Sequence, residues 1–142
     1  MLTYTEFVPT FADRSAWTLP KVLRQRAQSH ADRVYLDAPD HSLTMTYREI
    51  HDTAERIASS LLRRGHLPGD RMVVMMANCP EYILAWLGSS LAGMAEVPIN
   101  SAYRGTFFEH QVRTVEASAA VVSIELAQIF VGSASALSLI HI

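Results

Sequence analysis

The residues with the most reactive side chains are spread along the chain instead of gathering in one motif. The single cysteine, Cys79, stands beside an expected helix start, where the helix dipole can lower the pKa of a thiol. No activating base is adjacent to it in the sequence, so we expect a small residue near a helix cap and not a nucleophile. The six histidines are dispersed, with no pair at metal-ligand spacing and no cysteine beside them, which argues against a metal site. They are His30, His41, His51, His66, His110 and His141.

Motifs for phosphate binding and nucleophilic catalysis are also missing. The sequence contains no glycine-rich loop ending in Lys-Ser/Thr and no G-x-G-x-x-G after a strand. Residues 88–92, Gly-Ser-Ser-Leu-Ala, lack the closing glycine of a nucleophile elbow and fall inside an expected helix, so we interpret them as a small-residue packing face. Met72, Met75 and Met76 could bind a soft metal, but on a strand methionines more often fill the core. We therefore assign no catalytic, cofactor-binding or metal-ligating residue.

The composition excludes several classes of protein. With 49% hydrophobic and 18% charged residues, the 142-residue chain is expected to form one ordinary domain, or part of one, around a buried core. The formal net charge is -2 and no basic cluster alternates with aromatic residues, so nucleic acid is not an expected partner. A lone thiol suits a reducing compartment, and residues 1–14 do not resemble a secretory signal, so we expect a cytoplasmic protein. The longest apolar stretch, residues 82–95, is too short for a transmembrane segment.

The first part of the chain predicts an arm, a helix and a hairpin. Residues 1–17 show no sustained period and are expected to form an N-terminal arm. Thr18 is placed to cap a helix whose apolar residues recur at helical spacing. Residues 34–38 and 43–46 read as two strands, and the Pro-Asp-His-Ser turn between them predicts a short hairpin.

A long helix, a buried strand and a second helix are expected next. Residues 46–49, Thr-Tyr-Arg-Glu, have the form of a capping box, and the apolar period carries this helix to a C-cap at Gly65. Residues 71–77 form a near-continuous apolar run, which is typical of a strand covered on both faces. Residues 78–81, Asn-Cys-Pro-Glu, offer a capping side chain, a first-turn proline and an acid at the positive end of the dipole. They predict a helix that continues to about Gly93.

The remaining pattern completes an alternation of strands and helices. Residues 95–98 predict a strand and residues 100–105 a loop. Thr106 and Glu109 repeat the capping-box spacing at the start of a helix, and residues 119–124 predict the next strand. With right-handed crossovers, this order indicates an α/β fold: a partial doubly wound, mainly parallel sheet with flanking helices and an N-terminal hairpin.

The end of the chain has a different character. Residues 128–142 could continue a helix, but residues 132–136 have a weak composition and the chain closes on an unprotected apolar stretch. The closing Leu-Ser-Leu-Ile-His-Ile resembles translated adapter sequence. We therefore treat residues 128–142 as a doubtful tail whose native reading frame is lost by about residue 133.

Four segments together resemble the start of one enzyme family. In their order and spacing they resemble the AMP-forming acyl-CoA synthetases, over about residues 18–126. The Asn-Cys-Pro-Glu and Val-Pro-Ile-Asn sequences are most similar to those of crotonobetaine/carnitine:CoA ligases. The segments are residues 43–50 (Leu-Thr-Met-Thr-Tyr-Arg-Glu-Ile), 69–74 (Gly-Asp-Arg-Met-Val-Val), 78–82 (Asn-Cys-Pro-Glu-Tyr) and 93–100 (Gly-Met-Ala-Glu-Val-Pro-Ile-Asn).

The resemblance implies that residues 18–127 are a partial N-terminal domain of a ligase. Such enzymes use ATP, Mg²⁺ and CoA to convert a carboxylic acid into an acyl-adenylate and then into an acyl-CoA. The family's phosphate loop, its acidic Mg²⁺ ligand, its ribose-binding aspartate and its C-terminal lysine are all absent from this sequence. No catalytic residue is therefore transferred, and we expect this chain to be inactive alone and to bind none of these cofactors tightly.

Two other interpretations remain open at this point. The chain could be a fragment of a peptide-synthetase adenylation domain, which a carrier domain would follow. It could instead be a stand-alone α/β interaction module that self-associates, because an interrupted parallel sheet leaves apolar surface and a strand edge uncovered.

Overall fold

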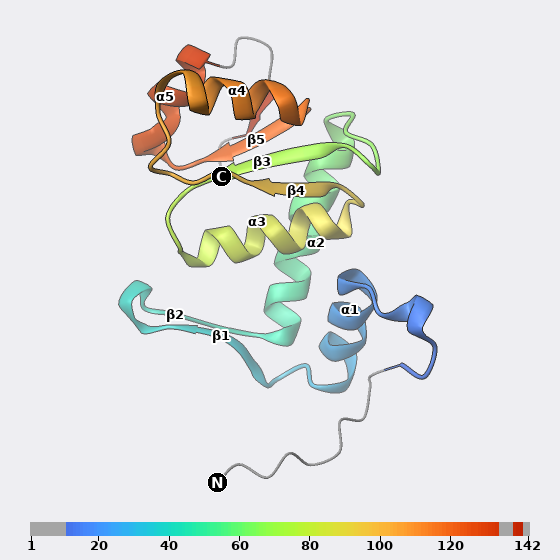
Figure 1. Ribbon diagram of the computed structural model, residues 1–142. Helices are drawn as coiled ribbons and strands as arrows, with labels where there is room; N and C mark the ends of the chain where they lie inside the picture. Colours follow the sequence, from blue (N-terminus) through green and yellow to red (C-terminus); the bar gives the residue numbers. More distant parts are fainter. Residues whose placement is uncertain (1–10, 134–137, 141–142) are drawn as a thin grey trace, which may run out of the picture.

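The computed structural model describes residues 11–133 and 138–140, and two groups of elements make up the fold (Figure 1). A lower group holds the first helix and a hairpin, and an upper group holds a parallel sheet with helices on both faces; the long helix α2 connects them (Figure 1). The helices are η1 (Arg14–Ala16), α1 (Leu19–Ser29), η2 (Pro39–His41), α2 (Tyr47–Arg63), α3 (Pro80–Leu91), α4 (Gly105–Val115) and α5 (Ile124–Ser133). The strands are β1 (Val34–Ala38), β2 (Leu43–Thr46), β3 (Arg71–Met75), β4 (Ala95–Pro98), β5 (Ala119–Val122) and β6 (Ser138–Ile140).

The upper sheet is parallel throughout its described strands, in the order β4-β3-β5-β6. Strand β3 lies between β4 and β5, and helices cover both of its faces. Met72 and Val74 point into a core built with α2 and α3, while Val73 and Met75 point into a second core that includes Phe108 of α4. This period of two explains the continuous apolar run that the sequence shows in the strand. The predicted α/β fold with a parallel sheet is confirmed.

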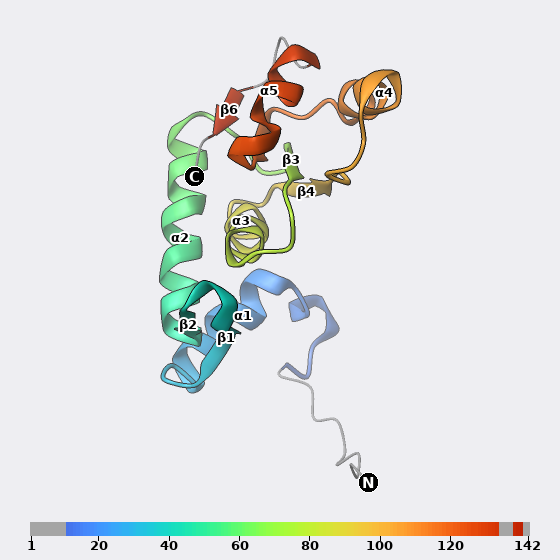
Figure 2. The ribbon, with the colours of Figure 1, turned by 90° about the vertical axis from the view of Figure 1, so that its left-hand side faces the viewer.

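The winding direction of the chain reverses at β3. From β3 the chain passes through α3 to β4 on one side, and from β4 it passes through α4 to β5 on the other side of β3. Figure 2 shows α3 and α4 on opposite sides of the sheet. The reversal places the switch point of the sheet at the end of β3, a geometry that matters for ligand binding.

The hairpin and α1 pack against the lower half of α2 and α3. Strands β1 and β2 pair antiparallel, with Ala38 opposite Leu43, so the predicted hairpin is confirmed. Its connection is the short helix η2, and Ser42, which follows it, is in the left-handed conformation (φ 50°). A third core joins these parts, and its buried members are Leu23, Ile50, Ala54 and Leu87.

One of the predicted helix caps forms as expected. Thr46 caps α2: the Glu49 N–H donates to Thr46 Oγ1 at 3.3 Å, and the Thr46 N–H donates to Glu49 Oε2 at 2.8 Å. The hydrogen bond from the Thr46 backbone is the main reason why the pKa of Glu49 is lowered. At Gly65, just beyond the end of α2, φ is +91°, as a glycine at the end of a helix allows.

The other capping predictions are wrong in detail. Thr18 occupies the N-cap of α1 but makes no side-chain hydrogen bond there. Helix α3 begins at Pro80 with Cys79 as its N-cap, so Asn78 lies one residue too early to cap it. Helix α4 begins at Gly105, because Arg104 is still extended, and the Thr106–Glu109 spacing therefore falls inside the helix.

The strand predicted over residues 119–124 ends earlier than expected. Strand β5 stops at Val122, and Ile124 starts α5, where it is exposed. The Ser123 N–H still donates to the Met75 carbonyl of β3, but the Ser123 carbonyl accepts from the Leu126 N–H and so turns the chain. The helix expected after Glu125 is present as far as Ser133. Whether residues 128–142 are native stays a prediction, and residues 134–137 and 141–142 lie outside the described residues.

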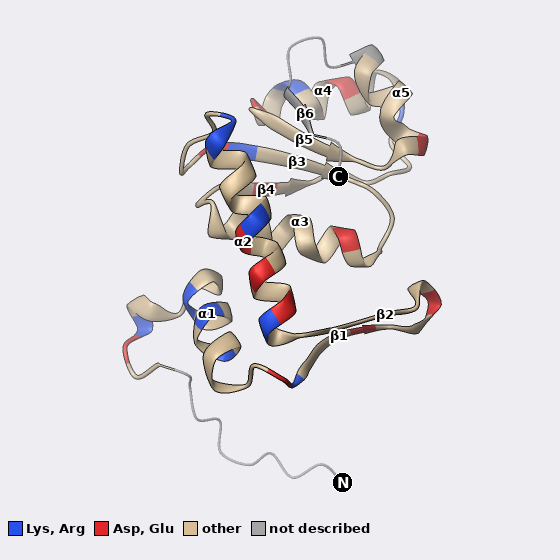
Figure 3. Ribbon diagram, turned by 180° about the vertical axis from the view of Figure 1, so that it is seen from behind, with Lys and Arg blue, Asp and Glu red and all other residues tan. Residues whose placement is uncertain are grey.

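The strands of the sheet carry few charged residues (Figure 3). Within β3, β4 and β5 the charged residues are Arg71 and Glu96. Within the described ranges, no helix is both long enough and apolar enough to cross a membrane.

Candidate functional site

The carboxyl ends of β3, β4 and β5 lie at one edge of the sheet, where their arrowheads point in the same direction (Figure 1). In open α/β sheets, ligands bind in the crevice outside the carboxyl ends of the strands, where the winding reverses. The chain leaves these strands at Met76, Ile99 and Ser123. We therefore take this edge as the candidate functional site.

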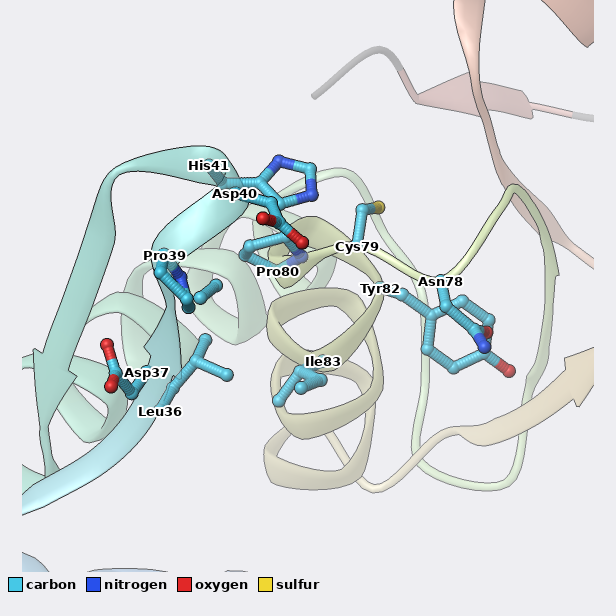
Figure 4. A pocket seen from close by; sticks show the side chains of 11 residues that line it. Leu36, Asp37, Pro39, Asp40, His41, Asn78, Cys79, Pro80, Tyr82 and Ile83 are labelled. Atoms are coloured by element: carbon cyan, nitrogen blue, oxygen red, sulfur yellow. The ribbon is translucent and has the colours of Figure 1, made fainter.

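The turn between β3 and α3 is bordered by three recesses. The hairpin recess, about 410 Å³, lies between the hairpin turn and the start of α3, with His41 and Asp40 above Pro80 (Figure 4). The strand-end recess, about 470 Å³, lies between this turn and residues 98–101 after β4. The β5 recess, about 480 Å³, lies between the turn and residues 121–125.

Tyr82 in the first turn of α3 lines both the hairpin recess and the strand-end recess. In Figure 4 its ring points away from the hairpin, on the same side as Asn78. Burial raises the pKa of Tyr82 to about 12, and hydrogen bonding with the Glu96 carboxyl and its negative charge add to the effect. Burial also raises the pKa of Glu96, which the hydrogen bond with Tyr82 partly opposes. The phenol is therefore a stable donor at neutral pH.

Cys79 borders two recesses, but its surroundings do not activate it. Burial is the main reason why the pKa of the Cys79 thiol is raised. The Cys79 Sγ–H donates to Met76 Sδ at 3.7 Å. A thiolate is the reactive form of cysteine, so this thiol is less reactive than an ordinary one near neutral pH. The helix-start activation considered for Cys79 does not occur.

The loop after β4 is fixed by hydrogen bonds of its own. Asn100 Oδ1 accepts from the Ala102 N–H at 2.9 Å. The Arg104 guanidinium donates to the carbonyls of Ser101 and Tyr103, at 2.6 and 2.7 Å. This arrangement brings a positive charge close to the strand ends, and positive charge near such a site favours an anionic ligand.

The other residues considered from the sequence lie elsewhere. Ser89 is fully buried within α3 and donates to the Trp86 carbonyl, so the small-residue packing face is confirmed. Met72 and Met75 are fully buried core residues, as expected, whereas Met76 lies beside the recesses. The placed histidines sit on separate elements, and His41 alone among them lines one of the three recesses. His141 lies outside the described residues.

Within the described part of the chain, no three His, Cys, Asp or Glu side chains gather in a way that could hold a metal ion.

A second polar cluster lies at the opposite, amino edge of the sheet. Buried His66 approaches Ser118 Oγ at 3.1 Å through Nδ1, and Ser118 Oγ donates to Asp70 Oδ2 at 3.1 Å. Serine bridges the other two groups here, so the imidazole is not placed between a nucleophile and a carboxylate as in a catalytic triad.

Sequence reasoning missed the residues that line the recesses. From the sequence alone, Tyr82, Asn78 and Asn100 are expected only as parts of helix starts and strand ends. The available signal was their position: polar residues that directly follow predicted parallel strands meet at one edge.

Comparison with known proteins gives the family. The family model described as AMP-binding enzyme matches residues 23–139. The chain belongs to the AMP-binding enzyme family. The resemblance of the four sequence segments is thereby confirmed.

Relatives within the AMP-binding family include CoA ligases and peptide synthetases. The medium/long-chain-fatty-acid–CoA ligase FadD6 of Mycobacterium tuberculosis (strain ATCC 25618 / H37Rv) is 33% identical over 105 residues, which cover 74% of this chain and 17% of that protein. The phosphinothricin tripeptide synthetase PhsC of Streptomyces viridochromogenes is 32% identical over 116 residues, covering 82% of this chain and 10% of that protein. The chain thus spans less than a fifth of these relatives.

A solved structure has the same fold over most of this chain. The crystal structure described as a long-chain-fatty-acid CoA ligase from Rhodopseudomonas palustris CGA009 superposes with a TM-score of 0.82 at 27% sequence identity. The match covers 89% of this chain and 33% of that chain. The α/β layer and hairpin of this chain therefore correspond to a part of a larger adenylate-forming enzyme fold.

Proposed function

We propose that the protein that carries this chain is an ATP-dependent carboxylic acid:CoA ligase. In the first step a carboxylate oxygen bonds to the α-phosphorus of ATP and pyrophosphate leaves. In the second step the sulfur of CoA bonds to the acyl carbon, AMP leaves and the thiol proton passes to solvent. The observation that carries the proposal is the 33% identity over three quarters of this chain to a protein named as a fatty-acid–CoA ligase.

This chain contributes the scaffold of one side of the site. Its residues position the carboxyl edge of the sheet, where the Tyr82 hydroxyl, the Asn100 amide and the Arg104 guanidinium lie near the strand ends. None of the described residues forms a three-ligand group for Mg²⁺, so the step that needs a metal is assigned to no residue of this chain. The 142-residue chain alone is expected to be inactive.

The partners of the complete protein follow from the reaction. They are a small-molecule carboxylic acid, ATP with Mg²⁺, and CoA, and the place of action is the cytoplasm. The isolated chain is expected to self-associate, because apolar side chains are exposed on its surface and β4 leaves one edge of the sheet unpaired among the described strands. The exposed large apolar residues on α3, α4 and α5 are Trp86, Phe107, Ile124 and Val131.

A second candidate is the adenylation domain of a peptide synthetase. The 32% identity to a tripeptide synthetase over 116 residues favours it. Such a domain would activate an amino acid as its adenylate without releasing an acyl-CoA. The two candidates share the first step and differ in the acceptor of the second.

The test uses the full-length protein with ATP, Mg²⁺ and a panel of acids that includes fatty acids, benzoate, carnitine and amino acids. The proposal expects pyrophosphate release with at least one carboxylic acid, and a CoA thioester only when CoA is added. Pyrophosphate exchange with an amino acid, and no thioester with any acid, would support the peptide-synthetase candidate. Failure of every acid to release pyrophosphate would contradict both candidates.

A further inference from the structure

Ser118 joins two turns that are far apart in the sequence. Its hydroxyl donates to Asp70 Oδ2 at 3.1 Å, and because a hydroxyl carries a single proton, the same oxygen accepts from Nδ1 of His66 at 3.1 Å. Its backbone N–H donates to the Arg71 carbonyl at 3.0 Å. Ser118, the residue before β5, is therefore tied to the turn between α2 and β3.

Stability alone does not explain the amino-edge cluster, which consists of His66, Asp70 and Ser118. His66 is buried, with 6% of its surface exposed, and its Nε2 atom has no hydrogen-bond partner among the described residues. A buried polar atom without a partner destabilises a fold, and apolar residues of similar size would avoid that cost. Polar groups in a core can instead select one packing arrangement, as a single asparagine fixes the register of a coiled coil.

The side chains of β5 do little to fix its register on β3. Each face of the strand presents one alanine and then one valine: Ala119 and Val121 belong to the core formed with α2 and α3, and Ala120 and Val122 to the core that contains Phe108. A slip of one residue exchanges the two faces of a strand. In β5 a slip in either direction again places an alanine on one alanine position and a valine on one valine position, so two of the four positions keep their residue type.

A slip of β5 would be taken up in the turn that precedes it. The end of α4 is held separately, because the Arg71 guanidinium donates to the Val115 carbonyl at 3.1 Å and lies 3.5 Å from the Glu116 carboxylate. The change would therefore fall within residues 116–118, and β5 would move about 3.3 Å along β3. Residues 121–125, which line the β5 recess, would move with the strand.

We propose that Ser118 is a positioning residue that fixes β5 in one register on β3 and thereby sets the shape of the β5 recess at the opposite edge of the sheet. In this register Ala119 lies beside Met72, and Val121 lies beside Val74. In a slipped register the Ser118 hydroxyl leaves both of its partners, so two hydrogen bonds are lost. Each such hydrogen bond changes a ratio of populations by roughly tenfold, so the amino-edge cluster makes the slipped registers rare. The register does not depend on the proposed ligase function.

The experiment reads the register in the full-length protein by NMR of labelled valine and methionine methyl groups. In the native register the methyl groups of Val121 contact those of Val74, whereas in a slipped register they contact Val73 or Met75. Ser118→Thr and Ser118→Val are compared because the two new side chains have the same shape and differ in the hydroxyl. Ser118→Thr is expected to keep one set of Val121 contacts. Ser118→Val is expected to show a second set, since the loss of two hydrogen bonds lowers the ratio of native to slipped register roughly a hundredfold.

Thr114→Val on α4 is the matched control. It removes a hydroxyl from an exposed position, where that hydroxyl donates to the His110 carbonyl of its own helix, and it should leave the Val121 contacts unchanged. A folded Ser118→Val variant with the native contacts alone would overturn the proposal. A Ser118→Val variant that does not fold would overturn it too, because the hydroxyl would then supply stability instead of selecting a register. A second set of contacts in Ser118→Thr would equally contradict the role of the hydroxyl.

Discussion

Gly88 of α3 lies directly against Ile57 of α2. A Cβ atom added to Gly88 would stand 2.4 Å from Ile57 Cγ2 and 2.7 Å from Ile57 Cβ, distances that real Cβ atoms do not show. The absence of a side chain at position 88 therefore sets how closely α2 and α3 approach. These two helices cover one face of the sheet, and α3 begins directly after the turn that borders the candidate site.

The close contact predicts that Gly88→Ala destabilises the chain. Overpacking of a filled core costs about 1–3 kcal/mol, which outweighs the gain in helix propensity of about 1 kcal/mol from replacing glycine by alanine. Chemical unfolding of the two chains measures the difference. Ser59→Ala on the exposed face of α2 is the matched control and should change the unfolding free energy little. A Gly88→Ala variant as stable as the original chain would show that the helices can separate at no cost.

The contrast between two threonines at N-caps predicts unequal effects of the same substitution. Thr46→Ala removes a side-chain cap that accepts from the Glu49 N–H, and we expect a loss of about 1 kcal/mol of stability. Thr18→Ala removes no such hydrogen bond and should cost less. Urea unfolding of both variants gives the comparison. Equal losses would mean that the observed hydrogen bond does not explain the stabilisation.

The hydrogen bonding of Asp70 predicts that the stability of the chain depends on pH. The Leu67 N–H donates to Asp70 Oδ2 at 3.0 Å, and this hydrogen bond is the main cause of the lowered pKa of Asp70. Because the pKa is lower in the folded chain than the ordinary 3.8, the stabilisation is fully present above pH 3.8 and is lost as the pH falls through the folded value. When the free energy of unfolding is measured across this pH range, it should fall less steeply with decreasing pH in Asp70→Asn than in the original chain. Identical acid profiles would contradict the role of Asp70.

The half-buried thiol of Cys79 is expected to be alkylated slowly. Since the pKa of Cys79 is raised and its Sγ–H donates to Met76, iodoacetamide should modify it more slowly in the folded chain than in the same chain unfolded in urea. Mass spectrometry of timed samples measures both rates. A folded chain that reacts as fast as the unfolded one would show that the thiol is accessible and ionised.

The sequence predicted the order of elements well because local signals sufficed for it. The apolar run before Met76 is typical of a strand covered on both faces, and the Thr46–Glu49 spacing describes a cap that needs no tertiary contact. The caps at Asn78 and Thr106 failed because the extended residues Cys79 and Arg104 decide where those helices begin, and the sequence spacing does not report their dihedral angles.

The candidate site was not predictable residue by residue. Tyr82 comes from a helix start and Asn100 from the loop after an edge strand, and they line the same recess only because α3 packs on β4.

Formation of an acyl-adenylate from a carboxylic acid is the step that defines the proposed ligase. The most direct test follows the oxygen atoms of a substrate acid labelled with a heavy oxygen isotope in its carboxylate, with the full-length protein, ATP, Mg²⁺ and CoA. One labelled oxygen is expected in the phosphate of AMP, because in the proposed reaction the carboxylate attacks the α-phosphorus and CoA later displaces AMP. Label in inorganic phosphate with ADP as the nucleotide product, or no label in AMP while an acyl-CoA forms, would contradict it.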